Sequence, residues 1–415
     1  MAPRRKVPVE DRPIYERAPW TRDPDKVTRR IQRWRAKKWF DATAEMFALS
    51  KPRAGNDDRE DVFWECTEML GRGSFGMVGK WTKFDSRGNA VEHIAIKQAE
   101  VISNYDVDRR GNFDVPWEAR IMMELYDQGC ENVTRLKGLK LFPKGAQSRN
   151  WRYYVEYYKY GTLHGLIDNY LAYNRGNPRS QKRVPEEFIW QAFHELARAT
   201  YHMRTVKFGE NFAPPGNDQW ILHLDLKHEN ILLGTAPADE RYMPYPSLKV
   251  ADWGMAVCTS RQDPSNSVGW SRHGTICWFP PEQRDDGRYG RNWRRPTFGS
   301  RYEPYEMSHV IWQVGANMYG LMYLDRHNRD IDEQIDRHRR MEEELRKWDY
   351  SIFRGLKSGV YSPKLTALVE DCLRVDPQRR PRVRELAQRT REGLAPYLAR
   401  WRQTGQCPGL LVNTV

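Results

Sequence analysis

The stretch that decides the fold is HLDLKHEN at residues 223–230, which runs directly into the apolar segment ILL at 231–233. Asp225, Lys227 and Asn230 stand at offsets 0, 2 and 5, just before this predicted strand. An aspartate in such a loop can accept the proton of an attacking hydroxyl, and a nearby lysine can balance charge on a moving phosphoryl group. An asparagine can hold a metal ion through its amide oxygen. Short polar loops before strands are common, so the motifs upstream and downstream of this loop decide whether it has this role.

Two further motifs, one on each side of this loop, supply what that chemistry needs. Upstream, GRGSFGMV at 71–78 leads into a strand-like segment and not into a helix. Missing side chains at the glycines let backbone N–H groups approach phosphates. Downstream, ADWG at 251–254 provides a second carboxylate, Asp252. Oxygen ligands from Asn230 and Asp252 suit Mg²⁺ held against nucleotide phosphates.

These motifs closely resemble those of the protein kinase family, in the form usual for serine/threonine kinases. The resemblance covers roughly residues 63–400. It continues through IAIK at 94–97, GTICWFPPE at 274–282 and CLRVDPQRRP at 372–381. It implies an α+β fold of two lobes: a small, antiparallel, β-rich N-lobe with one helix at the αC position of the family, and a larger, mainly α-helical C-lobe.

The resemblance also assigns catalytic roles. Asp225 is the expected catalytic base, and Lys227 is expected to balance the charge on the transferred phosphoryl group. An ion pair between Lys97 and Glu118 is expected to steer Lys97 onto the α- and β-phosphates of ATP. Glu124 is the competing carboxylate for this pair, but the apolar spacing of the predicted helix favours Glu118.

A second set of residues is expected to bind ATP. This set comprises Gly71, Gly73, Ser74, Phe75, Gly76, Val78, Ala95, Lys97, Val155, Glu156, Tyr158 and Leu232. Val155 would take the gatekeeper position, and backbone groups of Glu156 and Tyr158 would meet the adenine edge. Later in the chain, Glu282 is expected to pair with Arg380.

Several residues depart from the family pattern. Leu224 replaces the arginine that usually precedes the catalytic aspartate, so an activation-loop phosphate loses its main partner. Activity is therefore expected not to require phosphorylation of that loop. Trp253 replaces the usual phenylalanine beside the metal-binding aspartate. Val310 stands where the family carries an aspartate that anchors the catalytic loop; His309 or Glu306 could substitute, or the loop could be held differently.

The chain is expected to have four parts: a basic extension at 1–60, an N-lobe at 61–158, a C-lobe at 159–400 and a tail at 401–415. The extension contains a predicted amphipathic helix at 27–49. This helix is expected to pack on the neighbouring domain; the alternatives are an acidic partner or an anionic membrane surface, and nucleic acid is not expected as a partner. Polar or basic insertions are expected near 172–184, 209–218, 234–246 and 284–301.

The composition of the chain indicates its cell compartment and the kind of partner that it binds. Its net charge is +13, with 68 Lys and Arg residues among 415, which favours acidic partners, phosphates or anionic lipid over neutral ones. The six cysteines form no CxxC pair, so neither a cysteine zinc site nor a disulfide framework is indicated. No apolar run approaches the length of a membrane span, and no signal peptide is evident. An intracellular protein, cytoplasmic or nuclear, is expected.

The leading interpretation is a serine/threonine protein kinase that transfers the γ-phosphate of ATP to a protein hydroxyl in an Mg²⁺-dependent reaction. Lys227 argues against a tyrosine kinase, whose loop usually differs at this position. Thr275 also favours a serine/threonine kinase. The main alternative is a pseudokinase that binds ATP or a partner without efficient turnover. An adaptor attached to RNA or membrane through the basic helix, and a kinase for small molecules, are further alternatives. The segment at 274–282, which docks peptides in the family, favours a protein substrate.

Overall fold

The computed structural model describes residues 63–73, 76–85, 87–100, 115–143, 149–208, 218–237, 241–266, 270, 273–283, 304–331, 333, 335 and 359–412. The predicted helix at 27–49 and the glycine-loop residues Ser74 and Phe75 lie outside these ranges. So do the predicted insertion at 284–301 and, except for Asp218, the one at 209–218. The described residues group into two compact units.

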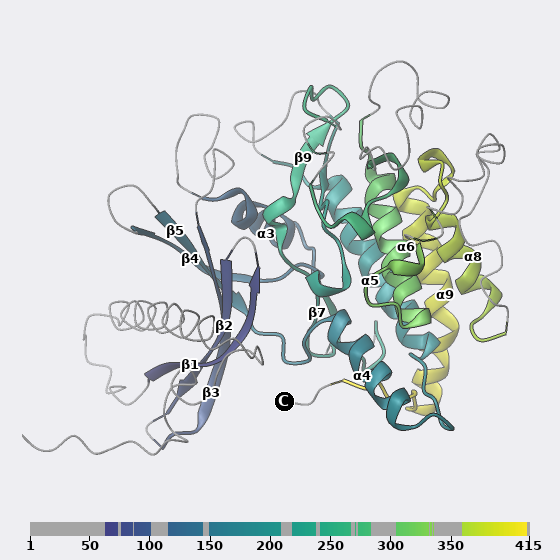
Figure 1. The fold of residues 1–415 in the computed structure, drawn as a ribbon, viewed down its shortest axis with the longest axis horizontal. Coiled ribbons are helices and arrows are strands. Elements are labelled where there is room, and N and C mark those ends of the chain that lie inside the picture. The colour runs from purple at the N-terminus through teal and green to yellow at the C-terminus, as the bar shows by residue number, and fades with distance from the viewer. Residues whose placement is uncertain are drawn as a thin grey trace, which may run out of the picture. The chain divides into compact units, whose positions relative to one another are not determined.

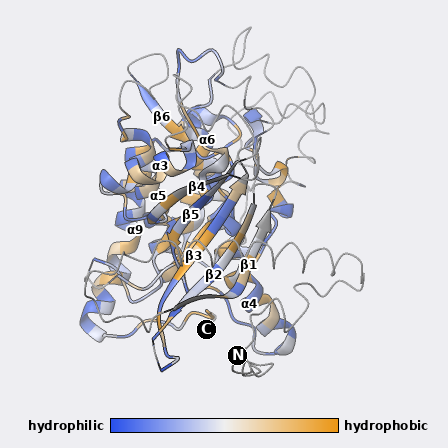
Figure 2. Cartoon of the chain, turned by 90° about the vertical axis from the view of Figure 1, so that its left-hand side faces the viewer, coloured by the Kyte–Doolittle hydropathy of each residue, from blue (hydrophilic) through white to orange (hydrophobic). Residues whose placement is uncertain are grey.

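The first unit is an antiparallel sheet with the strand order β1-β2-β3-β5-β4 (Figure 1). Its strands are β1 (Phe63–Gly73), β2 (Gly76–Phe84), β3 (Ala90–Glu100), β4 (Leu136–Pro143) and β5 (Arg149–Glu156). Hydrophobic and hydrophilic residues occur along the same strands (Figure 2), as expected where the two faces of a sheet differ. Trp81 pairs with Ile94 across β2 and β3, and both side chains are buried together with Ile96. They form the apolar core of this unit.

The second unit is mainly helical. Its helices are α3 (Trp117–Asp127), α4 (Leu163–Gly176), α5 (Glu186–Thr205), α6 (Met307–Tyr323), α8 (Pro363–Cys372) and α9 (Val383–Thr404). Helices α5, α6, α8 and α9 pack side by side (Figure 1). Nearly every residue of α6 is buried, so this helix forms the centre of the unit. The fold class predicted from the sequence, α+β with a β-rich part and a mainly helical part, is confirmed.

Two antiparallel strand pairs in the second unit carry the loop at 223–230, which was predicted to be catalytic. Strand β6 (Gln219–Leu222) pairs with β9 (Val257–Ser260), and β7 (Ile231–Leu233) pairs with β8 (Leu248–Val250). The loop between β6 and β7 ends in the short 3₁₀ helix η3 (His228–Asn230). The loop is therefore held at both ends by strand pairing.

Helix α3 groups with the second unit, and the indole Nε1 of Trp117 donates to the Ala256 carbonyl of that unit at 2.8 Å. The expected division into an N-lobe at 61–158 and a C-lobe at 159–400 stays a prediction. Helix α4 continues to Gly176, inside the expected insertion at 172–184. Helix α9 continues beyond residue 400 to Thr404. Among the described helices, none is long and apolar enough to cross a membrane.

Candidate active site

The side chains of Asp225, Lys227 and Thr275 form a closed hydrogen-bonded triangle. The Thr275 hydroxyl donates to Asp225 Oδ1 at 2.7 Å, and Lys227 Nζ lies 2.9 Å from Asp225 Oδ2. Lys227 Nζ also donates to the Thr275 hydroxyl oxygen at 2.8 Å. The Asp225 side chain is 11% exposed and that of Lys227 21%. A largely desolvated carboxylate thus faces a hydroxyl group and an ammonium group at the same time.

Asn230 completes this arrangement from the end of the loop. Its amide nitrogen donates to the carbonyl of Asp225 at 2.8 Å and to Asp225 Oδ2 at 3.1 Å. The orientation commits the nitrogen to the loop and leaves the amide oxygen as the atom suited to a hard cation.

The strand pair β7–β8 brings the two expected metal ligands to one place. Asn230 immediately precedes β7, and Asp252 lies just beyond the end of β8. Because the strands are antiparallel, with Ile231 opposite Val250, both residues lie at the same end of the pair. The Ala251 N–H donates to the Asn230 carbonyl at 2.8 Å and extends the pairing to the residue before Asp252. Asp252 has a left-handed backbone, with φ of 59°.

Helix α6 anchors the backbone of the catalytic loop. Gln313 Nε2 donates to the Leu224 carbonyl at 3.0 Å, and Asn317 Nδ2 donates to the Leu226 carbonyl at 3.1 Å. In return, His228 Nε2 lies 3.0 Å from the Asn317 carbonyl. Leu224 has φ of 63°, a conformation that is costly for a branched side chain and needs support from its surroundings. The amide side chains of α6 provide that support.

The sequence did not decide which residue anchors this loop. His309 and Glu306 were the two candidates, and neither contacts the loop in the hydrogen bonds and ion pairs described for them. Val310 is fully buried and has no side-chain donor. His309 Nε2 lies 2.7 Å from Gln283 Oε1, and Glu306 pairs with Arg261 at 2.6 Å. The loop is held differently, by Gln313 and Asn317, about one and two turns further along the helix.

A signal for the true anchors was present in the sequence. Gln313 and Asn317 are spaced i, i+4 in an otherwise apolar segment, so they lie on one face of a buried helix. Buried amides need hydrogen-bond partners, which marks such a pair as structural or functional.

His223 connects the two carboxylate-bearing segments. Its Nδ1 accepts the Asp225 N–H at 3.3 Å, and its Nε2 lies 3.1 Å from the Ala251 carbonyl. Burial lowers the pKa of His223, so the ring is neutral and donates only from Nε2. The ring packs against Trp253 at a centroid distance of 4.7 Å. The same cause, burial, lowers the pKa of His228.

Gly274 lets the Thr275 hydroxyl reach Asp225. Its φ is 109°, and a Cβ at this position would lie 2.3 Å from the Leu224 carbonyl oxygen. Only glycine fits so close an approach without displacing one of the two segments. The glycine of the GTICWFPPE motif therefore has a local geometric role in this site.

The carboxylates of Glu118 and Asp252 both lie beside Gly254. A Cβ built at Gly254 would be 3.7 Å from Glu118 Oε2 and 3.7 Å from Asp252 Oδ1. Glu118 is buried within α3. The expected ion pair of Glu118 with Lys97 joins residues of the two units and stays a prediction.

In the first unit, strand register gathers several expected nucleotide contacts on one face of the sheet. Val78 is opposite Lys97, and Ala95 is opposite Val155. Residues that are opposite each other, or two apart on one strand, share a face. Lys97 Nζ lies 5.8 Å from the centre of the Tyr153 ring on the neighbouring strand. Lys80 is opposite Ala95 and shares this face, so the surface combines apolar side chains with the ammonium groups of Lys97 and Lys80.

The expected glycine loop connects β1 and β2. Gly71 is opposite Val78, and Gly73 is opposite Gly76, directly on either side of Ser74 and Phe75. A Cβ at Gly76 would lie 1.9 Å from the backbone oxygen of Gln98, so this glycine is required by the close approach of β3.

The remaining expected nucleotide contacts lie at the end of β5 and in the second unit. Glu156 is the last residue of β5 and is half-buried. Tyr158 is buried, and its hydroxyl accepts the Arg135 N–H at 3.0 Å. Leu232 lies in the middle of β7 and is half-buried. The structure gives each residue a position, and its contact with a nucleotide stays a prediction.

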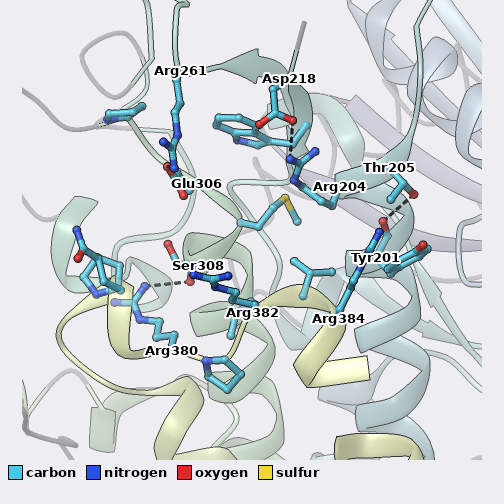
Figure 3. A pocket seen from close by; sticks show the side chains of 18 residues that line it. Tyr201, Arg204, Thr205, Asp218, Arg261, Glu306, Ser308, Arg380, Arg382 and Arg384 are labelled. Carbon is cyan, nitrogen blue, oxygen red and sulfur yellow. Dashed lines mark hydrogen bonds and ion pairs between the residues drawn. The ribbon is translucent and has the colours of Figure 1, made fainter. Parts of the chain in front are cut away.

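The predicted pair of Glu282 and Arg380 is confirmed as a two-pronged contact. Arg380 NH1 lies 2.7 Å from Glu282 Oε1, and NH2 lies 2.8 Å from Oε2. Burial acts to raise the pKa of Glu282, but the Arg380 guanidinium outweighs it and holds this pKa below its usual value. Arg380 also donates to the Ser308 carbonyl at 2.9 Å (Figure 3). This pair ties the end of the GTICWFPPE segment to the start of α6.

A cavity of about 1120 Å³ lies beside this pair and is lined by several arginines (Figure 3). Two of its cations are already neutralised: Arg204 pairs with Asp218 at 2.5 Å, and Arg261 pairs with Glu306 at 2.6 Å. None of the candidate catalytic, metal or nucleotide residues lines it. The cavity is therefore separate from the candidate active site.

Residues 64–390, most of the chain, match the protein kinase domain family. The chain belongs to this family, as the order of its motifs predicts. The segment matched contains every residue assigned above to catalysis, metal binding or nucleotide binding.

Individual relatives agree with this result. The chain is 25% identical over 339 residues to the G2-specific protein kinase nim-1 of Neurospora crassa. This alignment covers 77% of this chain and 32% of the relative. It is 24% identical over 332 residues to the G2-specific protein kinase nimA of Emericella nidulans, with 77% and 39% covered. It is 22% identical over 327 residues to the serine/threonine-protein kinase Nek8 of Danio rerio, with 78% and 36% covered. The domain and these relatives support a protein serine/threonine kinase, while the match spans only about a third of the length of each relative.

Replacing Asn317 with leucine is expected to lower both stability and turnover. The change leaves the buried carbonyl of Leu226 without its side-chain donor, which costs about 1–3 kcal/mol of unfolding free energy. Because the Leu226 carbonyl lies between Asp225 and Lys227, kcat should fall at temperatures where the variant is still folded. Urea unfolding and steady-state kinetics measure the two effects.

Asn169→Leu is the matched control. Asn169 Nδ2 also donates to a backbone carbonyl, that of Leu411 at 3.0 Å, but in the C-terminal segment. It should lose stability with kcat unchanged. Equal kcat in the Asn317 variant and the control would show that α6 does not position the loop.

Proposed function

We propose that the chain is an active serine/threonine protein kinase, which transfers the γ-phosphate of ATP to a serine or threonine hydroxyl of a protein. The observation that carries the proposal is the Thr275 hydroxyl, which donates to Asp225 Oδ1 at 2.7 Å while Lys227 Nζ lies 2.8 Å from the same hydroxyl. Asp225 thus already accepts a hydrogen bond from an aliphatic hydroxyl, the contact that a general base needs with a substrate.

The proposal gives each residue of the loop a role. Asp225 accepts the proton of the substrate hydroxyl, and Lys227 offsets the negative charge of the transferred group. Asn230 and Asp252 would hold Mg²⁺; one amide oxygen and one carboxylate at the same end of the β7–β8 pair fit a hard cation. When bound, Mg²⁺ supplies neutralisation of phosphate charge.

ATP would lie on the sheet face that carries Val78, Ala95 and Val155, with Lys97 directed to its phosphates. The apolar side chains suit an adenine ring, and the Lys97 ammonium group suits an anion. The glycine loop, including Ser74 and Phe75, and the backbone of Glu156 and Tyr158 complete the proposed nucleotide contacts, together with Leu232 and Glu118.

The reaction should identify its acceptor residue. With labelled ATP, Mg²⁺ and a generic protein substrate, acid hydrolysis of the product should release phosphoserine or phosphothreonine. Label confined to phosphotyrosine would contradict the assignment of the acceptor, and label only in a small molecule would contradict a protein substrate.

Activity is expected to survive removal of phosphate from the protein. Most kinases carry an arginine at this position that binds an activation-loop phosphate. The residue here is Leu224, which is fully buried and has no guanidinium group to bind a phosphate. Phosphatase treatment, verified by intact mass and followed by removal of the phosphatase, should leave kcat unchanged. Loss of turnover on dephosphorylation, with recovery after incubation with ATP, would refute this expectation.

The parts outside the catalytic core have supporting roles in the proposal. The basic extension at 1–60, with its helix at 27–49, would bind an acidic partner or an anionic surface, which the net charge of +13 supports. An N-lobe at 61–158 and a C-lobe at 159–400 would carry the reaction inside the cell, in the cytoplasm or nucleus, and 401–415 would form a tail.

A further inference from the structure

A group of metal-ligating side chains lies on the catalytic loop but takes no part in the proposed phosphoryl transfer. His164, Glu229 and His327 each place one ligand atom within 4.8 Å of the other two. Glu229 lies between the loop residues His228 and Asn230, so whatever binds this cluster also holds the loop.

The three side chains come from elements with fixed backbones. His164 is in the first turn of α4, which Thr162 caps by accepting the Gly165 N–H at 3.1 Å. Glu229 is in η3, and His327 follows α6 in a turn where its N–H donates to Asp325 Oδ1 at 3.2 Å. Ligands on rigid elements lose little entropy when they bind an ion.

The spacing of the ligand atoms suits a small divalent ion. His164 Nδ1 lies 3.3 Å from Glu229 Oε1. A tetrahedral ion with bonds of about 2.0–2.1 Å places its ligand atoms roughly 3.3–3.4 Å apart. This pair therefore already has the required separation, and a ligand atom of His327 lies within 4.8 Å of both. Within the described part of the chain, His164 Nδ1 and Glu229 Oε2 are buried atoms without a hydrogen-bond partner.

A second layer of contacts orients His164. Its other nitrogen, Nε2, lies 3.5 Å from Asp168 Oδ2, and Asp168 Oδ1 in turn pairs with Arg326 at 2.7 Å. A histidine that ligates a metal through one nitrogen characteristically donates from the other to a carboxylate. His164 fits this arrangement, because Nε2 faces the Asp168 carboxylate and Nδ1 faces Glu229, where the ion would bind.

We propose that His164, Glu229 and His327 form a Zn²⁺ site that fastens the catalytic loop to α4 and to the turn after α6. Two imidazoles and one carboxylate are zinc ligands, and imidazole discriminates against Mg²⁺, which prefers oxygen. With only three protein ligands, the fourth position is open to water; the Glu229 side chain is 40% exposed, which gives access. The site is distinct from the proposed Mg²⁺ ligands Asn230 and Asp252, and its occupancy does not depend on phosphoryl transfer.

Calorimetric titration of the chelator-treated full chain with ZnCl₂ tests the proposal without an activity assay. His164→Ala and His327→Ala should each remove one Zn²⁺ equivalent or weaken its binding at least tenfold, and Asp168→Asn should weaken it about 10- to 100-fold. The control His202→Ala, on α5, should bind as the wild type does. Excess Mg²⁺ should not displace the ion.

Two further measurements separate lost ligands from lost folding. The metal-free variants should unfold at the temperature of the metal-free wild type, while Zn²⁺ should raise the melting temperature of the wild type only. Co²⁺ in place of Zn²⁺ should give visible absorption of tetrahedral intensity that disappears in Glu229→Gln. Zn²⁺ binding that is unaltered in His164→Ala and His327→Ala, or no saturable binding to the wild type, would overturn the proposal.

Discussion

Asp225→Asn should lower kcat by about 10²–10⁴-fold, the range that general base catalysis contributes. Asparagine keeps the shape of the side chain but cannot accept a proton, and it loses the ion pair with Lys227 at 2.9 Å. The single amide oxygen can accept only one of the two hydrogen bonds that Thr275 and Asn230 donate to the carboxylate, but Asn230 keeps its bond to the backbone carbonyl of residue 225, so the loop should remain folded. Steady-state phosphorylation of a protein substrate, with ATP binding measured separately by thermal shift, records the effect.

Asp218→Asn is the matched control for this substitution. Asp218 also pairs with a cation, Arg204 at 2.5 Å, but in the arginine-lined cavity that is separate from the proposed active site (Figure 3). Its kcat should equal that of the wild type. If Asp225→Asn kept most of the wild-type kcat, Asp225 would not be the base and the proposed mechanism would be wrong.

Arg380→Met should be the most destabilising of the substitutions considered, with a loss of about 3–5 kcal/mol in unfolding free energy. The Arg380 side chain is 0% exposed and that of Glu282 13% exposed, so removal of the guanidinium leaves a buried carboxylate without its counter-charge. The carbonyl of Ser308 loses a donor as well. Urea unfolding at neutral pH measures the change.

A double-mutant cycle separates the pair from the rest of the environment. Arg380→Met with Glu282→Leu should be more stable than Arg380→Met alone, because the uncompensated carboxylate is gone. Arg389→Met is the control: Arg389 pairs with Asp371 at 2.7 Å but is 30% exposed, and exposed pairs contribute only about 0–1 kcal/mol. A loss in Arg380→Met no larger than in the control would show that the buried pair is not a structural tie.

The parts of the site that the sequence could predict are those coded within short segments. Asp225, Lys227 and Asn230 share one loop, and the spacing of the loop alone places their side chains together. Glu282 and Arg380 are far apart in sequence, yet each lies in a recognisable motif, and their predicted contact is confirmed.

The parts that the sequence could not predict depend on packing between distant elements. Thr275 reaches Asp225 because the Gly274 backbone passes close to the Leu224 carbonyl, a tertiary approach with no local signature. The anchoring of the loop by Gln313 and Asn317 was missed because the comparison considered one position of the helix, Val310. Their i, i+4 spacing places both amides on one face of α6, and the structure shows that this face contacts the loop.

The most direct test of the account is whether the chain turns over ATP or only binds it. The purified wild-type protein, incubated with γ-labelled ATP, Mg²⁺ and a protein substrate, should transfer label to serine or threonine, and removal of Mg²⁺ should abolish the transfer. A rise in melting temperature with ATP, in the absence of any transfer to substrate or to the chain itself, would instead identify a pseudokinase and contradict the assignment of Asp225 as a working catalytic base.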